Sequence, residues 1–370
     1  MKNFLFFSLM CVTVVISVSY ILWGGGKSER YNTTTLHSCD IKGDSILVDC
    51  QVCCYDNKQK TIVFTWDDSA YGLEDVADIF NTHNFRTTFF INTKKVAEQP
   101  FSKRHPFRRK LKNVINNVLL KGHEISSHTH NHLRLGDVSN TEIEQEMSLS
   151  SKSIYDMFGY YPSTLSHPES VYSYSVDSIM HLYYLDSRYS MSKDNDSTVR
   201  YMQVRTAYSF NYYKKNIDSF INSNADTYIF GGHQLENEGY EPMPSTILDS
   251  ILNYISFKYI DYCWITTFED MTLYNIIRDD VIIENTPGKI VVNTTQVDDI
   301  LNHFSHPHAV LTLRFIGENV DFVSDGMVLY RYDGQDTYCT IDLRKSNLIK
   351  YSVIDKNFDI QKPMRTGLNK

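Results

Sequence analysis

The sequence predicts an α/β fold that is built on a parallel sheet and followed by a small β domain. Strand-like and helix-like segments alternate between residues 61 and 276. Such repeated strand–helix units are typical of a parallel sheet, either a barrel or a doubly wound sheet. After residue 277 the helical period disappears and short β-prone runs follow. The pattern alone leaves the choice between the two parallel architectures open.

The N-terminal 23 residues are predicted to be an export signal. Lys2 is followed by a largely apolar run from Phe4 to Trp23. This run fits a secretory signal peptide, with Ser17 and Ser19 as small residues before a cleavage site. It also fits an uncleaved signal anchor, because about 20 apolar residues span a bilayer. Either way we expect the rest of the chain to be exported: secreted, periplasmic or membrane-anchored, with its folded part outside the cytoplasm.

Residues 24–57 are expected to be a linker and a short β segment. Four of the seven cysteines lie there: Cys39, Cys50, Cys53 and Cys54. The C-x2-C spacing of Cys50 and Cys53 could suggest zinc, but no second pair lies at a suitable distance. In an oxidising compartment a disulfide is favoured, and pairing of Cys39 with Cys50 across a turn at residues 42–44 is one option.

The α/β part, residues 58–276, follows from hydrophobic periodicity. Its strands are predicted at 61–65, 86–91, 123–127, 163–167, 182–186, 227–231 and 261–266. Its helices are predicted near 73–80, 109–120, 139–158, 213–222, 244–257 and 268–276. The run Thr61–Thr65 is a continuous strand-like stretch, as expected of a strand that is covered on both faces. Thr141 and Glu144 fit a capping box at the start of the long helix.

The C-terminal part, residues 277–370, is predicted to be a small β-sandwich-like domain because its β-prone runs are short and no helical period separates them. The runs are 289–293, 310–316 and 327–332. The composition as a whole, with 42% hydrophobic and 22% charged residues, is that of a globular protein. The formal net charge of −8 argues against a nucleic-acid binder, which needs a basic face.

Two carboxylates follow the first buried strand directly. Asp67 and Asp68 come after Thr65 and Trp66. Adjacent carboxylates at the end of a buried strand are costly unless a cation or hydrogen bonds neutralise them. The alternative is a solvated turn or helix cap, and this pair alone does not decide between the two.

A histidine-rich tract follows the strand at 123–127. His128 and His132 are four residues apart, so in a helical turn they would share one face and could hold one metal ion. In that geometry His130 points elsewhere. The alternative is a tract of polar histidines that are satisfied by hydrogen bonds.

A third histidine follows a later strand. His233 stands behind Gly231 and Gly232 at the end of the strand at 227–231. Parallel-strand architectures bind their ligands at the carboxyl ends of strands. Taken alone, His233 would be interpreted as an ordinary loop residue.

Together these clusters resemble the polysaccharide deacetylase family, named for the nodulation deacetylase. Its first motif, T-F-D-D, is similar to Thr65-Trp66-Asp67-Asp68, and its second, H-[ST]-x2-H, matches the tract from His128 to His132. Its last motif supplies a histidine that is matched by His233. The resemblance covers residues 58 to 276 and implies a distorted (β/α) barrel, of the TIM-like kind, in place of a doubly wound sheet.

The resemblance also implies a catalytic or metal-binding role for each of these residues. Asp68, His128 and His132 would hold a divalent metal, with Zn²⁺ expected and Co²⁺ as an option. Two histidines and one carboxylate leave a position open for water, as hydrolytic sites need. Asp67 would be the general base and His233 the general acid.

One position departs from the family. Its third motif has an arginine two residues before a proline, and that arginine orients the base. Here Ser166 takes that position, two residues before Pro168. Arg188, Arg205 or His167 could substitute for it. Asp186 is the candidate partner for His233.

The sequence thus predicts a metal-dependent hydrolase that removes acetyl groups from an N- or O-acetylated polysaccharide. One alternative is a deacetylase-fold protein with weakened catalysis that binds carbohydrate. Another is a hydrolase of a different amide. The expected partners are an acetylated polysaccharide and, through the N-terminal segment, a membrane, but no nucleic acid.

Overall fold

The structure of the chain is a computed structural model. It describes residues 46–68, 72–98, 111–171, 173–188, 198–205, 207–236, 240–304 and 309–354. The predicted export signal, Cys39 and the turn at 42–44 lie outside this part of the chain, within which Cys50 is a free thiol. No helix of the described residues is both long and apolar enough to cross a membrane.

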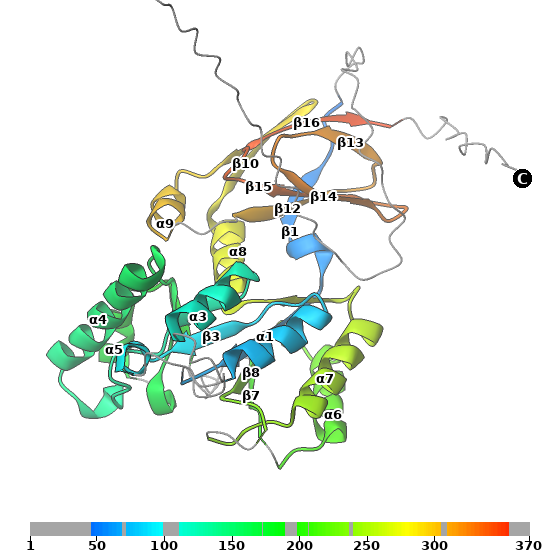
Figure 1. Cartoon of the computed structure of the whole chain (residues 1–370). Helices are drawn as coiled ribbons and strands as arrows, with labels where there is room; N and C mark the ends of the chain where they lie inside the picture. The colour runs from blue at the N-terminus through cyan, green and yellow to red at the C-terminus, as the bar shows by residue number, and fades with distance from the viewer. Residues whose placement is uncertain are drawn as a thin grey trace, which may run out of the picture. The chain divides into compact units, whose positions relative to one another are not determined.

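Eight parallel strands form the sheet of the α/β part (Figure 1). They are β2 (Lys60–Trp66), β3 (Thr88–Ile91), β4 (Glu124–Ser127), β5 (Thr164–Ser166), β6 (Asp186–Arg188), β7 (Val199–Gln203), β8 (Thr227–Gly232) and β9 (Cys263–Thr266). Their order is β6-β5-β4-β3-β2-β8-β7, and β9 pairs with the start of β2. Within the described residues β6 and β7 do not pair with each other, so the sheet is a half-barrel. This is the distorted (β/α) barrel that the sequence predicts.

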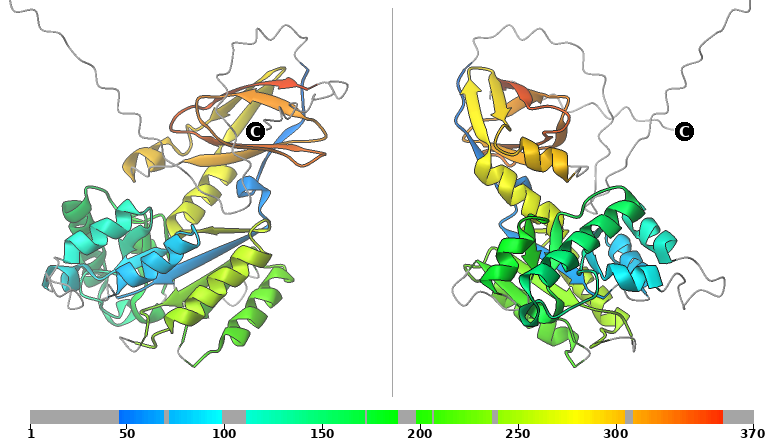
Figure 2. Two further views of the ribbon diagram at one scale, coloured as in Figure 1. Left: turned by 45° about the vertical axis from the view of Figure 1, so that its right-hand side comes forward. Right: turned by 90° about the vertical axis from the view of Figure 1, so that its left-hand side faces the viewer.

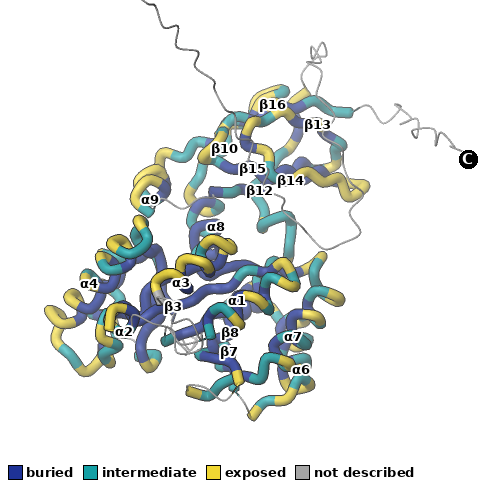
Figure 3. Tube along the Cα trace, viewed as in Figure 1, coloured by how far each residue is buried: buried dark blue, intermediate teal, exposed yellow. Residues whose placement is uncertain are grey.

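Helices pack around this sheet. They are α1 (Leu73–Thr82), α2 (Thr93–Glu98), α3 (Leu111–Leu120), α4 (Asn140–Phe158), α5 (Tyr174–Met180), α6 (Phe210–Ile221), α7 (Ser245–Lys258) and α8 (Phe268–Asp280). Figure 3 shows strands in dark blue beneath helices whose outer sides are exposed. In α1 the buried residues are Leu73, Val76, Ala77 and Phe80, at the spacing that places them on one helical face.

Three local predictions were wrong. The predicted strand at 182–186 is mostly a turn, and β6 begins only at Asp186. The cap of α4 is Ser139, not Thr141: the Ser139 side chain accepts from the Glu142 backbone N–H, and the Glu142 side chain accepts from that of Ser139. The sequence analysis also missed α2, α5 and β7.

The C-terminal part contains two antiparallel four-stranded sheets, as the sequence predicts (Figure 2). One has the order β1-β12-β15-β14 and the other β10-β11-β16-β13. The strands are β1 (Cys50–Cys53), β10 (Ile282–Thr286), β11 (Lys289–Asn293), β12 (Val310–Phe315), β13 (Val320–Val323), β14 (Met327–Tyr332), β15 (Thr337–Asp342) and β16 (Leu348–Val353), with helix α9 (Asp298–His303) between β11 and β12. The strand β1 precedes the half-barrel in sequence but pairs with β12.

The sandwich has an apolar cluster of its own. Leu311, Leu313 and Ile341 from the first sheet pack with Ile290 and Ile349 from the second, and all five are fully buried. Helix α8 contributes two further side chains, Leu273 and Ile277, to the same cluster. The last helix of the half-barrel therefore packs directly on the sandwich core.

Candidate metal centre and active site

The predicted site residues gather at one edge of the half-barrel. Asp67 directly follows β2, His128 follows β4 and His233 follows β8. Parallel strands present their carboxyl ends at the same edge of a sheet, so residues far apart in sequence meet there. The register is fixed by continuous pairing of β2 with β8 from Thr61 to Trp66 and of β3 with β4 from Thr88 to Ile91.

Asp68, His128 and His132 form the one group in the described residues that could hold a metal ion. One ligand atom from each lies within 4.8 Å of the others. Asp68 Oδ1 is 3.6 Å from His128 Nε2 and 3.2 Å from His132 Nε2. Two ligands at about 2.1 Å from a tetrahedral zinc ion lie about 3.4 Å apart, so these separations fit such an ion.

The tautomer of His128 also suits a ligand. Its Nδ1 lies 2.8 Å from the backbone carbonyl oxygen of Ser166. Because a carbonyl oxygen only accepts, Nδ1 carries the proton and Nε2 presents its lone pair toward Asp68. Burial lowers the pKa of His128 and keeps the imidazole in its neutral, metal-binding form. The residues present therefore fit a divalent metal.

The backbone around this group adopts an unusual conformation. Asp68 has φ 78°, Thr129 φ 62° and His132 φ 61°, a left-handed region that non-glycine residues seldom occupy. The helical turn expected for His128 and His132 is wrong, because residues 128–132 form a loop without helical structure. Such strain persists where surrounding contacts enforce it, and it is concentrated at functional sites.

Several hydrogen bonds hold the histidine loop. The backbone N–H of His132 donates to Thr129 Oγ1 over 3.2 Å. Asn131 donates from its backbone and its side chain to Glu146 over 2.7 and 2.5 Å. His130 pairs with Thr93 Oγ1 at 2.9 Å, outside the metal group. The sequence analysis did not predict this role of Glu146. The signal was a carboxylate three residues after Ile143, on the apolar face of α4, where a charged residue needs a partner.

Asp67 lies beside the metal group but has different partners. Its backbone N–H donates to the Gly232 carbonyl over 2.9 Å, and its Oδ2 accepts from Ser166 Oγ over 3.2 Å and from Arg188 Nη2. Its Oδ1 is buried and has no hydrogen-bond partner in the described part of the chain. Burial opposes ionisation, but the positive charge of Arg188 and its hydrogen bond hold the pKa of Asp67 below its usual value. Asp67 is thus a buried carboxylate with one oxygen available.

Three residues were candidates to replace the family arginine that orients the base. Of these, Arg188 is the one that contacts Asp67. It reaches Asp67 from the end of β6, and its Nη2 also donates to Ser166 Oγ over 2.5 Å. Arg205 instead pairs with Glu241 over 2.9 Å, and His167 Nε2 pairs with Ser187 Oγ over 2.8 Å. The serine thus lies within the base-holding network rather than leaving a gap.

Tyr201 holds Arg188 from the other edge of the half-barrel. Arg188 Nη1 donates to Tyr201 Oη over 3.0 Å, which joins the ends of β6 and β7. A Cβ on Gly231 would lie 2.1 Å from this same Tyr201 oxygen, which explains why the chain carries glycine there. Sequence reasoning missed Tyr201 because it missed β7.

His233 directly follows β8, at the same edge of the sheet as Asp67 and Asp68 after β2. The ring stands edge-on to Tyr240, with centroids 5.1 Å apart. Its Nδ1 has no hydrogen-bond partner in the described residues. The prediction that Asp186 is the partner of His233 is wrong. Asp186 is the first residue of β6, and its Oδ2 accepts a hydrogen bond from Thr272 Oγ1 over 3.2 Å.

Comparisons with known proteins agree with this geometry. Residues 55–185 match the family model described as "Polysaccharide deacetylase". A stretch of 111 residues, 30% of this chain, is 28% identical to the peptidoglycan-N-acetylglucosamine deacetylase PgdA of Listeria monocytogenes. That stretch spans 21% of the relative, so most of the relative has no counterpart in the match.

Two solved structures are also similar. The Bc1960 peptidoglycan N-acetylglucosamine deacetylase is 19% identical, with a TM-score of 0.43 and coverage of 59% of this chain and 89% of that one. The family 4 carbohydrate esterase of Streptomyces lividans, solved in complex with acetate, is 13% identical, with a TM-score of 0.40 and coverage of 54% and 90%. The matched segment, residues 55–185, is thus similar to the polysaccharide deacetylase family.

Proposed function

We propose that this protein is a metal-dependent hydrolase that removes acetyl groups from an N- or O-acetylated polysaccharide. One observation carries the proposal. Asp68, His128 and His132 converge within 4.8 Å, while the neighbouring Asp67 is held apart from them by Arg188. A set of ligands next to a separate carboxylate is what hydrolysis by a metal-activated water needs.

In this proposal the metal ligands, the general base and the general acid are different residues. A zinc ion held by Asp68, His128 and His132 would supply a water of lowered pKa and polarise the acetyl carbonyl. Asp67 is the general base, because its carboxylate lies 4.0 Å from His128 Nε2, its Oδ1 has no hydrogen-bond partner among the described residues, and its lowered pKa keeps it ionised at neutral pH. His233, the half-buried residue that follows β8, is the general acid that protonates the leaving amine or alcohol.

The wider organisation is part of the same proposal. Residues 58–276 are the catalytic domain, and residues 277–370 an accessory β domain. The N-terminal segment, residues 1–23, exports the protein or anchors it to a membrane, so that the site faces polymers outside the cytoplasm.

The proposal is tested by acetate release. The zinc-loaded protein and its Asp67→Asn variant are assayed on acetylated chito-oligosaccharides, acetylated xylan and peptidoglycan fragments. We expect acetate from at least one polymer with the unaltered protein, and a loss of at least a hundredfold with Asp67→Asn, in keeping with the typical contribution of a general base. No release from any polymer, with zinc or cobalt present, would contradict the proposal.

The non-catalytic alternative loses its main support in the structure. It rested on the absence of the family's base-orienting arginine at Ser166. The contact of Arg188 with Asp67 from β6 supports the catalytic proposal over this alternative. Hydrolysis of a different amide remains an outcome of the assay.

A further inference from the structure

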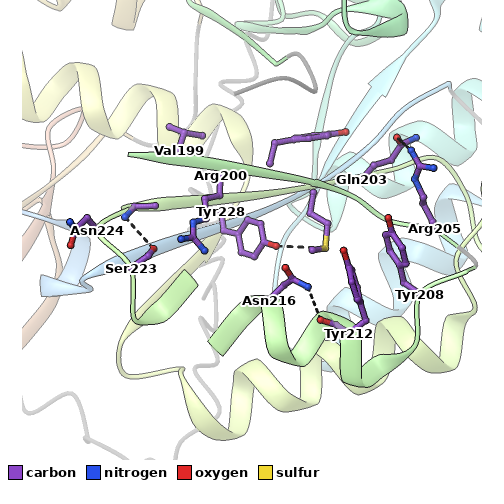
Figure 4. Close-up of a pocket in the computed structure, with 13 residues that line it drawn as sticks. Val199, Arg200, Gln203, Arg205, Tyr208, Tyr212, Asn216, Ser223, Asn224 and Tyr228 are labelled. Atoms are coloured by element: carbon purple, nitrogen blue, oxygen red, sulfur yellow. Dashed lines mark hydrogen bonds between the residues drawn. The ribbon is translucent and has the colours of Figure 1, made fainter. Parts of the chain in front are cut away.

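We propose that a groove beside β7 binds the polymer beyond the reacting sugar and selects polymers that carry carboxylate groups. The inference rests on the proposed function and specifies its substrate class. The groove, shown in Figure 4, lies along the edge of β7 that has no strand partner in the described residues. Its volume is about 870 Å³, within the range of ligand-binding pockets.

The lining suits a sugar chain. From α6 come Tyr212 and Asn216, and Tyr208 precedes this helix. Tyr208 and Tyr212 stack with centroids 4.2 Å apart, and Tyr212 is 42% exposed. Amphipathic rings of this kind offer an apolar face and a hydroxyl at once. The far end of the groove adds the polar residues Ser223 and Asn224.

Two sets of contacts link residues of the groove to residues of the candidate active site. Tyr201, which lines the groove, accepts the hydrogen bond of Arg188, and Arg188 holds Asp67. At the end of β7, Arg205 pairs with Glu241, and the adjacent Tyr240 packs edge-on against His233. The proposal places one sugar at the metal group and the following sugars along β7 in the groove.

The preference for carboxylates follows from charge. The lining contains two arginines and no acidic residue, on a chain whose net charge is −8. Arg205 is neutralised by Glu241, whereas among the described residues Arg200 hydrogen-bonds to the hydroxyl of Ser219, 3.3 Å away, and has no carboxylate partner. Guanidinium groups bind carboxylates with two parallel hydrogen bonds. Repulsion from acidic groups elsewhere on the chain is screened beyond about 8 Å at physiological salt.

The test compares binding of two probes of matched length. One is peptidoglycan glycan strands, whose lactyl groups carry carboxylates, and the other is neutral acetylated chito-oligosaccharides. Arg200→Gln should weaken binding of the acidic strands about fivefold, as expected for one partly exposed charge-assisted contact. It should change binding of the neutral oligomers less than twofold. Tyr212→Ala should weaken both.

Lys215→Gln is the matched control, because it removes the same charge from an exposed position on α6 outside the groove. It should leave both affinities unchanged. Equal effects of Arg200→Gln and Lys215→Gln, or equal effects of Arg200→Gln on both probes, would overturn the inference. Acetate release from a short neutral substrate is measured in parallel: its absence would refute the hydrolase, whereas unselective binding with normal release would refute only the groove.

Discussion

The Asp67–Arg188 pair gives the sharpest energetic prediction. Both side chains are removed from water, with 10% and 3% of their surfaces exposed. With charge centres about 4 Å apart and an effective dielectric constant of about 20, Coulomb's law gives an attraction of about 4 kcal/mol. Removal of one partner from a buried pair destabilises a protein by about 3–5 kcal/mol, because the other charge remains buried and uncompensated.

A double-mutant cycle isolates this interaction. Arg188→Gln and Asp67→Asn should each lower the free energy of unfolding, measured in urea at pH 7. The double variant should lose less than the sum of the two by about 2–4 kcal/mol, because no unpaired charge is left. Since the pKa of Asp67 is lowered in the folded state, the effect of Arg188→Gln should shrink as the pH falls through that pKa. Additive losses within about 0.5 kcal/mol would refute the assignment.

Three other predictions follow from the same contacts. Burial and the nearby Glu269 raise the pKa of Glu124 to about 8, so its stabilising contribution is present below pH 4.5 and is lost as the pH rises through 8. Thermal unfolding at pH 6 and pH 8.5 should therefore show a smaller pH effect for Glu124→Gln, and an unchanged pH effect would contradict the shift. Ser139→Ala should lower stability by about 1 kcal/mol, whereas Thr141→Ala should change it by less than about 0.5 kcal/mol; equal losses would argue against the observed cap. Addition of a chelator should lower the melting temperature of the unaltered protein and leave that of His132→Ala unaffected, because that variant has no metal to lose.

Much of the candidate site was readable because each cluster is local in sequence. Asp67 and Asp68 follow one strand, His128 and His132 another, and a parallel sheet collects strand ends at one edge. What brings the two histidines together was not readable. The left-handed backbone of Thr129 and His132 depends on contacts such as that of Asn131 with Glu146, which lies 15 residues away in α4.

The sequence could not decide which arginine holds the base, because that depends on which strands are neighbours and how the sheet opens. The strand β6 consists of three polar residues, Asp186, Ser187 and Arg188, so its pattern does not resemble a strand. The apolar run before it was predicted as the strand instead. The strand β7 lies at an edge of the half-barrel and mixes polar and apolar residues, which hides its period. At α4 both Ser139 and Thr141 have a glutamate three residues later, and only the structure shows which one caps the helix.

The zinc content of purified variants tests the central claim most directly. Each protein is freed of metal, incubated with zinc, separated from the excess and measured for bound zinc per chain. The account predicts one zinc in the unaltered protein and in Asp67→Asn, and none in Asp68→Ala or His132→Ala. An unchanged stoichiometry in His132→Ala, or loss of zinc in a folded Asp67→Asn variant, would contradict the assignment of three ligands and a separate base.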